Sequence, residues 1–234
     1  MGTRCESPWT EPPLEERLPD MTIAGIPPPP LPADQALKLL QEGNRRFVQH
    51  VRTHDSEEER AALAAGQRPH TVILSCSDSR VPSELVFDQG LGDLFVIRVA
   101  GNVVAPSLVG SVEFAAATFG TRLAVVMGHS RCGAIKATLD FIQHDVDSPS
   151  ENIHDIVDRC RPAVESVVHA AGPSVDKARL VHEAVRANVR QSCAHLRHGS
   201  RLLERLIQEE GMLIVGAEYS LETGQVDFFE PQVR

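Results

Sequence analysis

Residues 71–80 have the sequence Thr-Val-Ile-Leu-Ser-Cys-Ser-Asp-Ser-Arg, in which a short apolar run ends in a cluster of polar and reactive side chains. The run at residues 71–75 is rich in β-branched residues, which is typical of a strand buried on both faces of a parallel sheet. Comparable runs follow at residues 94–99, 123–127 and 212–217. After the turn Glu222-Thr223-Gly224, residues 226–229 form a last run that we expect to be an antiparallel edge strand.

Helical signals fill the segments between these runs. We expect one helix to begin at the N-cap Asp34 and a second at the capping box of Ser56 and Glu59. A third should run from the N-cap Ser107 to Gly120, and a fourth should follow Cys132. A long helical stretch should extend from about residue 153 to 210, with interruptions at Pro162 and near Gly199 and Ser200. The alternation predicts an α/β fold whose mainly parallel central β-sheet has about four parallel strands plus an antiparallel edge strand, flanked by helices. Ligands of such sheets gather at the carboxyl ends of the strands.

Composition and charge narrow the class of protein. The 32 acids against 23 Lys and Arg give a formal charge of −9, which argues against nucleic acid as a partner. No apolar run approaches the roughly 18 residues that cross a bilayer, and no apolar signal segment is present in residues 1–32. We therefore expect a cytoplasmic protein with no membrane partner. Five scattered cysteines indicate reduced thiols. The Pro-rich residues 1–32 predict an extended or disordered N-terminal arm, followed by one domain at residues 33–234.

Three potential metal ligands fall at the ends of predicted strands. Cys76 follows the first strand, His129 the third, and Cys132 lies three residues later, where the next helix begins. Two thiolates and an imidazole suit Zn²⁺, and three protein ligands leave a fourth position open, as in catalytic zinc sites. The helix start should lower the pKa of the Cys132 thiol. A closed structural site with Cys160 or Cys193 as fourth ligand is the alternative, although both lie in apolar helical stripes typical of core thiols.

Asp78 and Arg80 lie beside this potential metal site. In an extended chain, residues 76 and 78 share a side, which brings the Asp78 carboxylate to the open position of the metal. Paired with Arg80, Asp78 would accept a hydrogen bond from the metal-bound nucleophile and orient it. Released by Arg80, Asp78 would instead become a fourth ligand and close the site. The alternative is a structural ion pair without a catalytic role.

The motifs around these residues resemble those of the β-class carbonic anhydrases. The matching segments are Cys76-Ser-Asp-Ser-Arg-Val81, Gly92-Asp-Leu-Phe-Val-Ile-Arg98 with Ala100-Gly-Asn102, Gly110-Ser-Val-Glu-Phe114 and Met127-Gly-His-Ser-Arg-Cys-Gly133, with weaker similarity over residues 34–230. The resemblance implies the β-carbonic anhydrase fold, with one Zn²⁺ per subunit on Cys76, His129 and Cys132. It implies Asp78 and Arg80 as the catalytic pair, and in some members the aspartate itself closes the site on zinc. It also implies a homodimer or homotetramer.

The activity implied by the resemblance is that of a zinc lyase, carbonate dehydratase. A zinc-bound hydroxide would attack CO₂, and the reaction would reversibly give bicarbonate and a proton. Because two thiolates neutralise the charge of Zn²⁺, we expect activity to rise toward alkaline pH. We expect Val81, Phe95 and Val99 to line an apolar pocket for CO₂. Gly90 stands where plant-like members have a glutamine, and the adjacent Gln89 should point elsewhere.

Two alternative functions fit the same residues. A hydrolase of carbonyl sulfide or carbon disulfide would use the same fold and zinc ligands on analogues of CO₂. A non-catalytic zinc- or bicarbonate-binding scaffold would need the ligands but not the catalytic pair, so the intact Asp78 and Arg80 argue against it.

Overall fold

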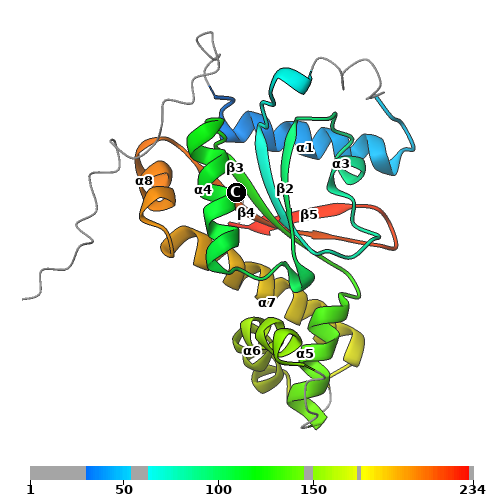
Figure 1. The fold of residues 1–234 in the computed structure, drawn as a ribbon. Helices are drawn as coiled ribbons and strands as arrows, with labels where there is room; N and C mark the ends of the chain where they lie inside the picture. Colours follow the sequence, from blue (N-terminus) through cyan, green and yellow to red (C-terminus); the bar gives the residue numbers. More distant parts are fainter. Residues whose placement is uncertain (1–29, 54–62, 145–149, 173–174, 232–234) are drawn as a thin grey trace, which may run out of the picture.

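A sheet of five strands forms the centre of the protein in a computed structural model (Figure 1). The structure describes residues 30–53, 63–144, 150–172 and 175–231. The strands are β1 (Thr71–Ser75), β2 (Leu94–Arg98), β3 (Leu123–His129), β4 (Leu213–Tyr219) and β5 (Val226–Glu230). Their order is β2-β1-β3-β4-β5, with the first four parallel and β5 antiparallel to β4. The predicted α/β architecture and the antiparallel edge strand are confirmed.

Helices cover both faces of this sheet (Figure 1). On one face, α1 (Ala33–Val48) and the short α3 (Ser83–Val86) pack against alternate residues of β1, β3 and β4. On the other face, α4 (Pro106–Thr118), α7 (Lys177–His198) and α8 (Arg201–Glu209) pack against the intervening residues. Every residue of β1 and β3 is consequently buried, as their continuous hydrophobicity predicts.

A third group of helices lies beyond the carboxyl ends of the strands. It consists of α5 (Gly133–His144), α6 (Glu151–Ala171) and part of α7, and Figure 1 shows α5 and α6 standing below the sheet. Its apolar cluster includes Cys76, Cys132 and Cys160. The potential metal ligands therefore lie where the sheet meets this helical layer.

Two residues in the second half of α1 fix its docking. A Cβ at Gly43 would lie 1.7 Å from the backbone carbonyl oxygen of Phe87, so only glycine permits this approach. The buried Asn44 donates hydrogen bonds to the carbonyls of Val86 and Gly224, and it accepts one from the first N–H of β5. These bonds join α1, α3 and the β4–β5 turn, three segments far apart in the sequence.

The predicted N-caps of α1 and α4 are each wrong by two residues. Asp34 lies in the first turn of α1, which begins at Ala33 after Pro32. Ser107 lies inside α4, which begins at Pro106. A proline at a helix start has a suitable fixed φ, and the N–H that it lacks would be unpaired there in any case. Proline therefore marks these two starts better than the polar side chain that follows it.

The interruption predicted at Pro162 is also wrong, because α6 runs through this residue. A proline removes one helical hydrogen bond and crowds the preceding turn. Cys160 and Val164 on either side of it are buried in the cluster with α5 and α7, and this packing holds the helix together. The long helical stretch instead stops after α6 and resumes where Asp176 caps α7. The second predicted break is confirmed, since Ser200 caps α8.

Two predictions concern residues outside the described part of the chain. They are the N-terminal arm, of which residues 1–29 are not described, and the helix expected from Ser56 and Glu59. Before β1, the structure describes the short helix η2 (Leu63–Ala65). Among the helices described, none has the length and apolar character needed to span a membrane.

Candidate metal centre

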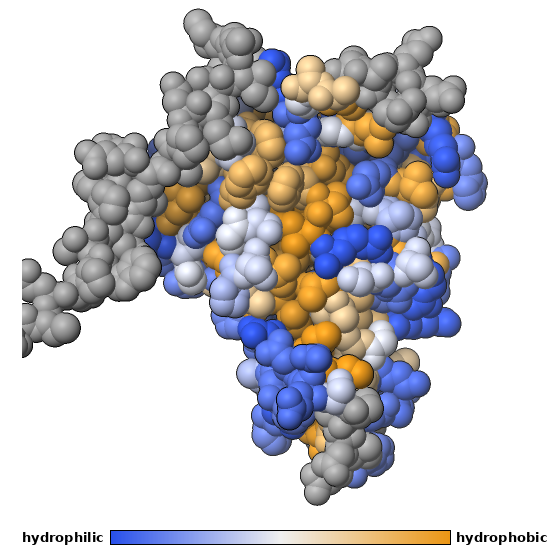
Figure 2. Space-filling model, in the orientation of Figure 1, coloured by the Kyte–Doolittle hydropathy of each residue, from blue (hydrophilic) through white to orange (hydrophobic). Residues whose placement is uncertain are grey.

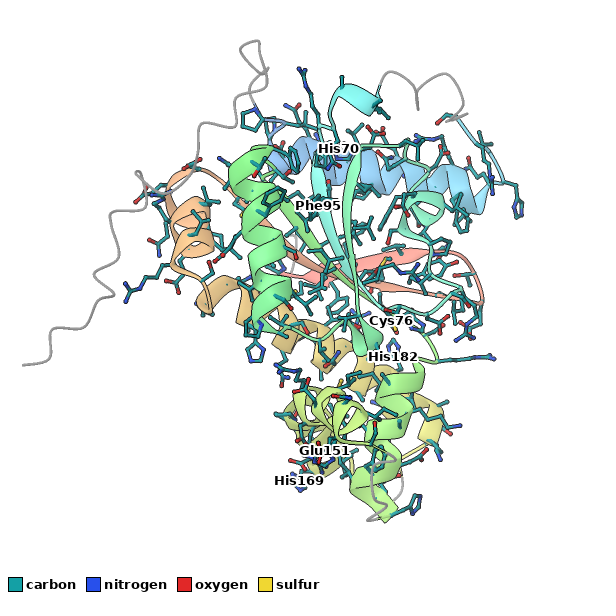
Figure 3. All side chains as sticks on the ribbon, viewed as in Figure 1. His70, Cys76, Phe95, Glu151, His169 and His182 are labelled. Atoms are coloured by element: carbon teal, nitrogen blue, oxygen red, sulfur yellow. The ribbon has the colours of Figure 1, made fainter. Side chains whose placement is uncertain are left out.

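The three potential ligands meet at the carboxyl edge of the sheet. Cys76 directly follows β1, His129 is the last residue of β3, and Cys132 precedes α5. Because β1 and β3 are adjacent and parallel, their ends lie side by side. The two Sγ atoms and one ring nitrogen of His129 all lie within 4.8 Å of one another, and all three residues are buried. Figure 3 shows Cys76 at this edge, at the opposite end of the sheet from His70.

The His129 ring is oriented to offer Nε2 to a ligand. Its Nδ1 lies 2.9 Å from the backbone carbonyl oxygen of Ser130, which can only accept, so Nδ1 carries the proton. Nε2 is buried and has no hydrogen-bond partner within the described residues. Leaving a buried acceptor unpaired is costly, and a metal ion would use its lone pair. This nitrogen and the two thiols fit a zinc ion.

The two thiols are hydrogen-bonded to each other, and their pKa values are shifted in opposite directions. The hydrogen bond with Cys132 lowers the pKa of the Cys76 thiol to about 4, against the effect of burial. The same hydrogen bond, together with burial, raises the pKa of Cys132 well above its usual range. N–H groups at the start of α5 act in the predicted lowering direction, while the hydrogen bond with Cys76 and burial act against them. Metal ligation requires both thiolates and therefore releases thiol protons.

Asp78 and Arg80 form a two-pronged ion pair beside this group. Arg80 Nε donates to Asp78 Oδ1 at 2.9 Å and Nη2 donates to Oδ2 at 2.7 Å, and the Arg80 backbone N–H adds a third bond at 3.0 Å. These donors hold the pKa of the Asp78 carboxyl well below its usual range. Asp78 Oδ2 lies 3.8 Å from His129 Nε2. The structure thus has Asp78 in the paired arrangement, next to the ligand atoms but held by Arg80.

Arg98, whose role the sequence analysis missed, holds the backbone of this loop. From the end of β2 it donates through Nε to the carbonyl of Cys76 at 3.2 Å and through Nη2 to the carbonyl of Asp78 at 2.5 Å. It thereby ties the loop that carries Cys76 and Asp78 to the end of β2. Its position at the end of a predicted strand was visible in the sequence, but the pairing of β2 with β1, which brings it to Cys76, was not.

A second set of contacts, which the sequence analysis also missed, holds the loop at Ser130 and Arg131. Ser130 Oγ donates to Glu222 Oε2 at 2.7 Å and accepts from the N–H of Leu221 at 3.0 Å. Arg131 has a φ of 55° and pairs with Glu222 through Nε at 2.6 Å. The β4–β5 turn thus fixes the loop that joins His129 to Cys132.

The structure separates Val81 from the other two predicted pocket residues, because Phe95 and Val99 both pack against the apolar cluster on the α4 side of the sheet. Phe95 packs with Phe114 and Phe119, whose ring centroids lie 6.2 and 6.0 Å from its own, respectively. Val81 is buried in the apolar cluster of the opposite face. Gln89 points elsewhere, as predicted: it donates to nearby backbone carbonyls and contacts His70.

Cys160 and Cys193 are core thiols, as their helical stripes predict. Each is fully buried, in a different apolar cluster. Burial raises the pKa of each thiol to about 12. Neither belongs to the group of potential metal ligands, so the described residues do not complete a closed four-ligand site with a third cysteine.

Comparisons with known proteins agree with this geometry. Residues 71–226 match the family model for carbonic anhydrase. Carbonic anhydrase 2 of Mycobacterium tuberculosis is 40% identical over 194 residues, covering 81% of this chain and 89% of that protein. The solved structure of the β-carbonic anhydrase CcaA matches with a TM-score of 0.65 and 26% identity over 86% of this chain and 91% of that one. A tetrameric β-carbonic anhydrase from Sordaria macrospora has the same fold, with a TM-score of 0.66, 22% identity and coverage of 73% and 85%. The chain belongs to the carbonic anhydrase family, in its β class.

Proposed function

We propose that the chain is a zinc-dependent carbonic anhydrase, which reversibly hydrates CO₂ to bicarbonate and a proton. The observation that carries the proposal is the buried group of Cys76, His129 and Cys132 beside the ion pair of Asp78 and Arg80. We assign the first three as ligands of one Zn²⁺ per subunit. Bound there, zinc would supply Lewis-acid activation of a water molecule near neutral pH. Membership of the carbonic anhydrase family supports the reaction.

We assign Asp78 as the group that orients the attacking water. Its Oδ2 is close to the ligand atoms, 3.8 Å from His129 Nε2. From there the carboxylate accepts a hydrogen bond from the water and directs a lone pair toward CO₂. Arg80 holds both carboxylate oxygens in place. Because the pKa of Asp78 is depressed, the carboxylate stays ionised and can accept across the neutral pH range.

We also propose that two or four copies associate, with the outer edge of β2 in an interface. Figure 2 shows an apolar band over α4 and β2, and Phe114 on α4 is 45% exposed. As an edge strand, β2 has backbone groups available for pairing, and such apolar surface is typical of protein interfaces. The tetrameric Sordaria relative supports a homodimer or homotetramer. Light scattering should give at least twice the chain mass of 25.5 kDa, and a monomeric mass would contradict the proposal.

A cytoplasmic location completes the proposal. The four described cysteines are free thiols, and two of them lie close together. Closely spaced free thiols favour a reducing compartment. The described residues from 33 onward share one sheet that carries the whole candidate site, which supports a single catalytic domain at residues 33–234.

Stopped-flow measurement of CO₂ hydration tests the function. We expect the zinc-loaded protein to hydrate CO₂, with activity rising toward alkaline pH, since two thiolate ligands leave bound water less acidic than the pKa of about 7 typical of a site with three histidines. Asp78 does not contribute to this rise, because its pKa lies far below the range. Sulfide release from carbonyl sulfide without CO₂ hydration would refute the assignment. A hydration activity that does not change from mildly acidic to alkaline pH would refute the argument that two thiolate ligands make the bound water less acidic.

A further inference from the structure

The backbone carbonyl of Ser130 orients the His129 ring. The Nδ1–H donates to this carbonyl over 2.9 Å, which leaves Nε2 available to a metal ion beside Cys76 and Cys132. An acceptor on the ring nitrogen that does not bind the metal fixes the orientation of the ring and makes the other nitrogen a stronger ligand. The direction of the Ser130 carbonyl therefore affects how well His129 can bind zinc.

The peptide group that carries this carbonyl joins Ser130 to Arg131. Because a peptide group is planar, the direction of its carbonyl is set by two rotations, ψ of Ser130 and φ of Arg131. Arg131 has a φ of 55°, a value that residues with a side chain rarely adopt. Contacts that hold these two residues therefore help to keep the carbonyl directed at Nδ1.

One carboxylate contacts both residues, that of Glu222 in the β4–β5 turn. Ser130 Oγ donates to Oε2 at 2.7 Å, and Arg131 Nε lies 2.6 Å from Oε1. Ser130 is further tied to β4 and the turn, because its N–H donates to the carbonyl of Tyr219 at 2.9 Å and its Oγ accepts from the N–H of Leu221 at 3.0 Å. The two oxygens of Glu222 thus hold the residues on either side of the peptide that carries the carbonyl.

The turn that carries Glu222 is itself fixed to the fold. The carbonyl of Ser220 accepts from the N–H of Gly224 at 2.9 Å, and Ser220 Oγ accepts from that of Thr223 at 3.2 Å. The buried Asn44 of α1 donates to the carbonyl of Gly224 at 2.9 Å. Glu222 therefore extends from a well-supported turn, as a residue that positions a neighbouring group should.

An exposed ion pair alone would not give Glu222 such a role. The side chains of Arg131 and Glu222 are 74% and 44% exposed, and exposed pairs contribute little because water and salt screen them. The bond from Ser130 is different, since a hydroxyl that donates to a carboxylate makes a strong hydrogen bond. The serine side chain is short, so holding its Oγ also restrains the backbone. We therefore expect the contact with Ser130 to have the larger effect.

We infer that Glu222 is a positioning residue of the metal centre. It holds the peptide between Ser130 and Arg131 so that the carbonyl keeps accepting the Nδ1–H of the neighbouring histidine, and it thereby strengthens the binding of zinc at Nε2. The inference rests on the proposed function, in which His129 is a zinc ligand. Groups that orient a metal ligand typically change metal affinity by about 10- to 100-fold.

Zinc affinity, measured by competition with a chromophoric chelator, tests this role in the full-length protein. We expect Glu222→Ala to bind zinc roughly tenfold more weakly, at the lower end of that range, because Glu222 acts through an intervening peptide. In the zinc-loaded protein labelled with ¹⁵N-histidine, the Nδ1–H proton of His129 should also exchange with water faster than in the wild type. Loss of a carboxylate that only supported the fold would not change this exchange.

Asp227→Ala is the matched control on the same hairpin. Asp227 of β5 also pairs with an arginine, because its Oδ2 lies 2.7 Å from Arg186 Nη1, but that arginine belongs to α7. This variant should keep the zinc affinity and the His129 proton exchange of the wild type. An equal loss of zinc affinity in both variants would overturn the inference, since a change in surface charge or a looser hairpin would then explain it.

Wild-type zinc affinity and unchanged proton exchange in Glu222→Ala would also overturn the inference. If that variant does not fold, Ser130→Ala, which removes the hydroxyl from the other side of the contact, decides: we expect a comparable loss of zinc affinity, and an unchanged affinity would overturn the role. A wild-type protein that binds no zinc would instead refute the proposed function. The two failures are therefore distinguishable.

Discussion

Cys76→Ala is expected to abolish tight zinc binding and to reduce CO₂ hydration by more than the roughly 100-fold that loss of an outer hydrogen bond costs. Cys76 is one of three protein ligands in the proposed site, and His129 with Cys132 alone would hold the metal weakly. Cys160, although in the same apolar cluster, is not within reach of the ligand group. Zinc content after dialysis against a chelator and stopped-flow rates measure the two effects.

Cys193→Ala is the matched control, because Cys193 is an equally buried thiol that packs between α7 and β4. It should keep zinc and activity and lose only stability. Added zinc should raise the melting temperature of the wild type and of this control, because a ligand bound by the folded state alone stabilises it. Cys76→Ala should show no such rise. Full zinc occupancy in Cys76→Ala would contradict the ligand assignment.

The sheet and the gathering of Cys76, His129 and Cys132 could be predicted because both follow from short-range patterns. Continuous apolar runs indicate strands buried on both faces, and parallel strands bring their carboxyl ends to one edge. Residues that directly follow neighbouring strands then lie together, whatever the conformation of the loops. Asp78 and Arg80 were found for the same reason, since they are two positions apart and local geometry pairs them.

The supports of the site could not be predicted, because their contacts join distant segments. Arg98 is 22 residues from Cys76, and Ser130 is 91 residues from Leu221. A lone Arg or Ser has the same sequence signal whether its side chain faces solvent or a backbone group of a distant segment. The interruption wrongly predicted at Pro162 has a related cause: local propensity opposes the helix there, and the packing that maintains it comes from α5 and α7.

Asp78→Asn is expected to keep its zinc while turnover falls roughly 100- to 1,000-fold. The amide has the shape of the carboxylate, but its NH₂ group would face a donor of Arg80, so the two-pronged pair is lost. The attacking water then loses its oriented acceptor. Zinc content should be unchanged, because Asp78 is not among the three ligand atoms of the group. Stopped-flow turnover measured beside zinc content separates these effects, and wild-type turnover would show that the pair is structural.

Asp88→Asn provides the control for losing an Asp–Arg pair elsewhere in the fold. Arg46 Nε lies 2.6 Å from Asp88 Oδ2, where α1 docks. Asp88 has a φ of 42°, which asparagine tolerates. This variant should be less stable than the wild type but equal in turnover. A comparable fall in turnover would mean that loosening of the fold, rather than Asp78 itself, lowers the rate.

Asp78→Asn also tests our proposal that Asp78 closes the site as a fourth ligand when Arg80 releases it. Arg80 is 53% exposed, so its side chain can leave the pair without unpacking the core. In mildly acid solution a hydroxide on the metal would be protonated to neutral water, and a carboxylate such as Asp78 displaces neutral water more easily than hydroxide. Acidification should therefore change the coordination spectrum of the cobalt-substituted wild type but not that of Asp78→Asn. A wild-type spectrum independent of pH would rule out closure and leave Asp78 with the orienting role alone.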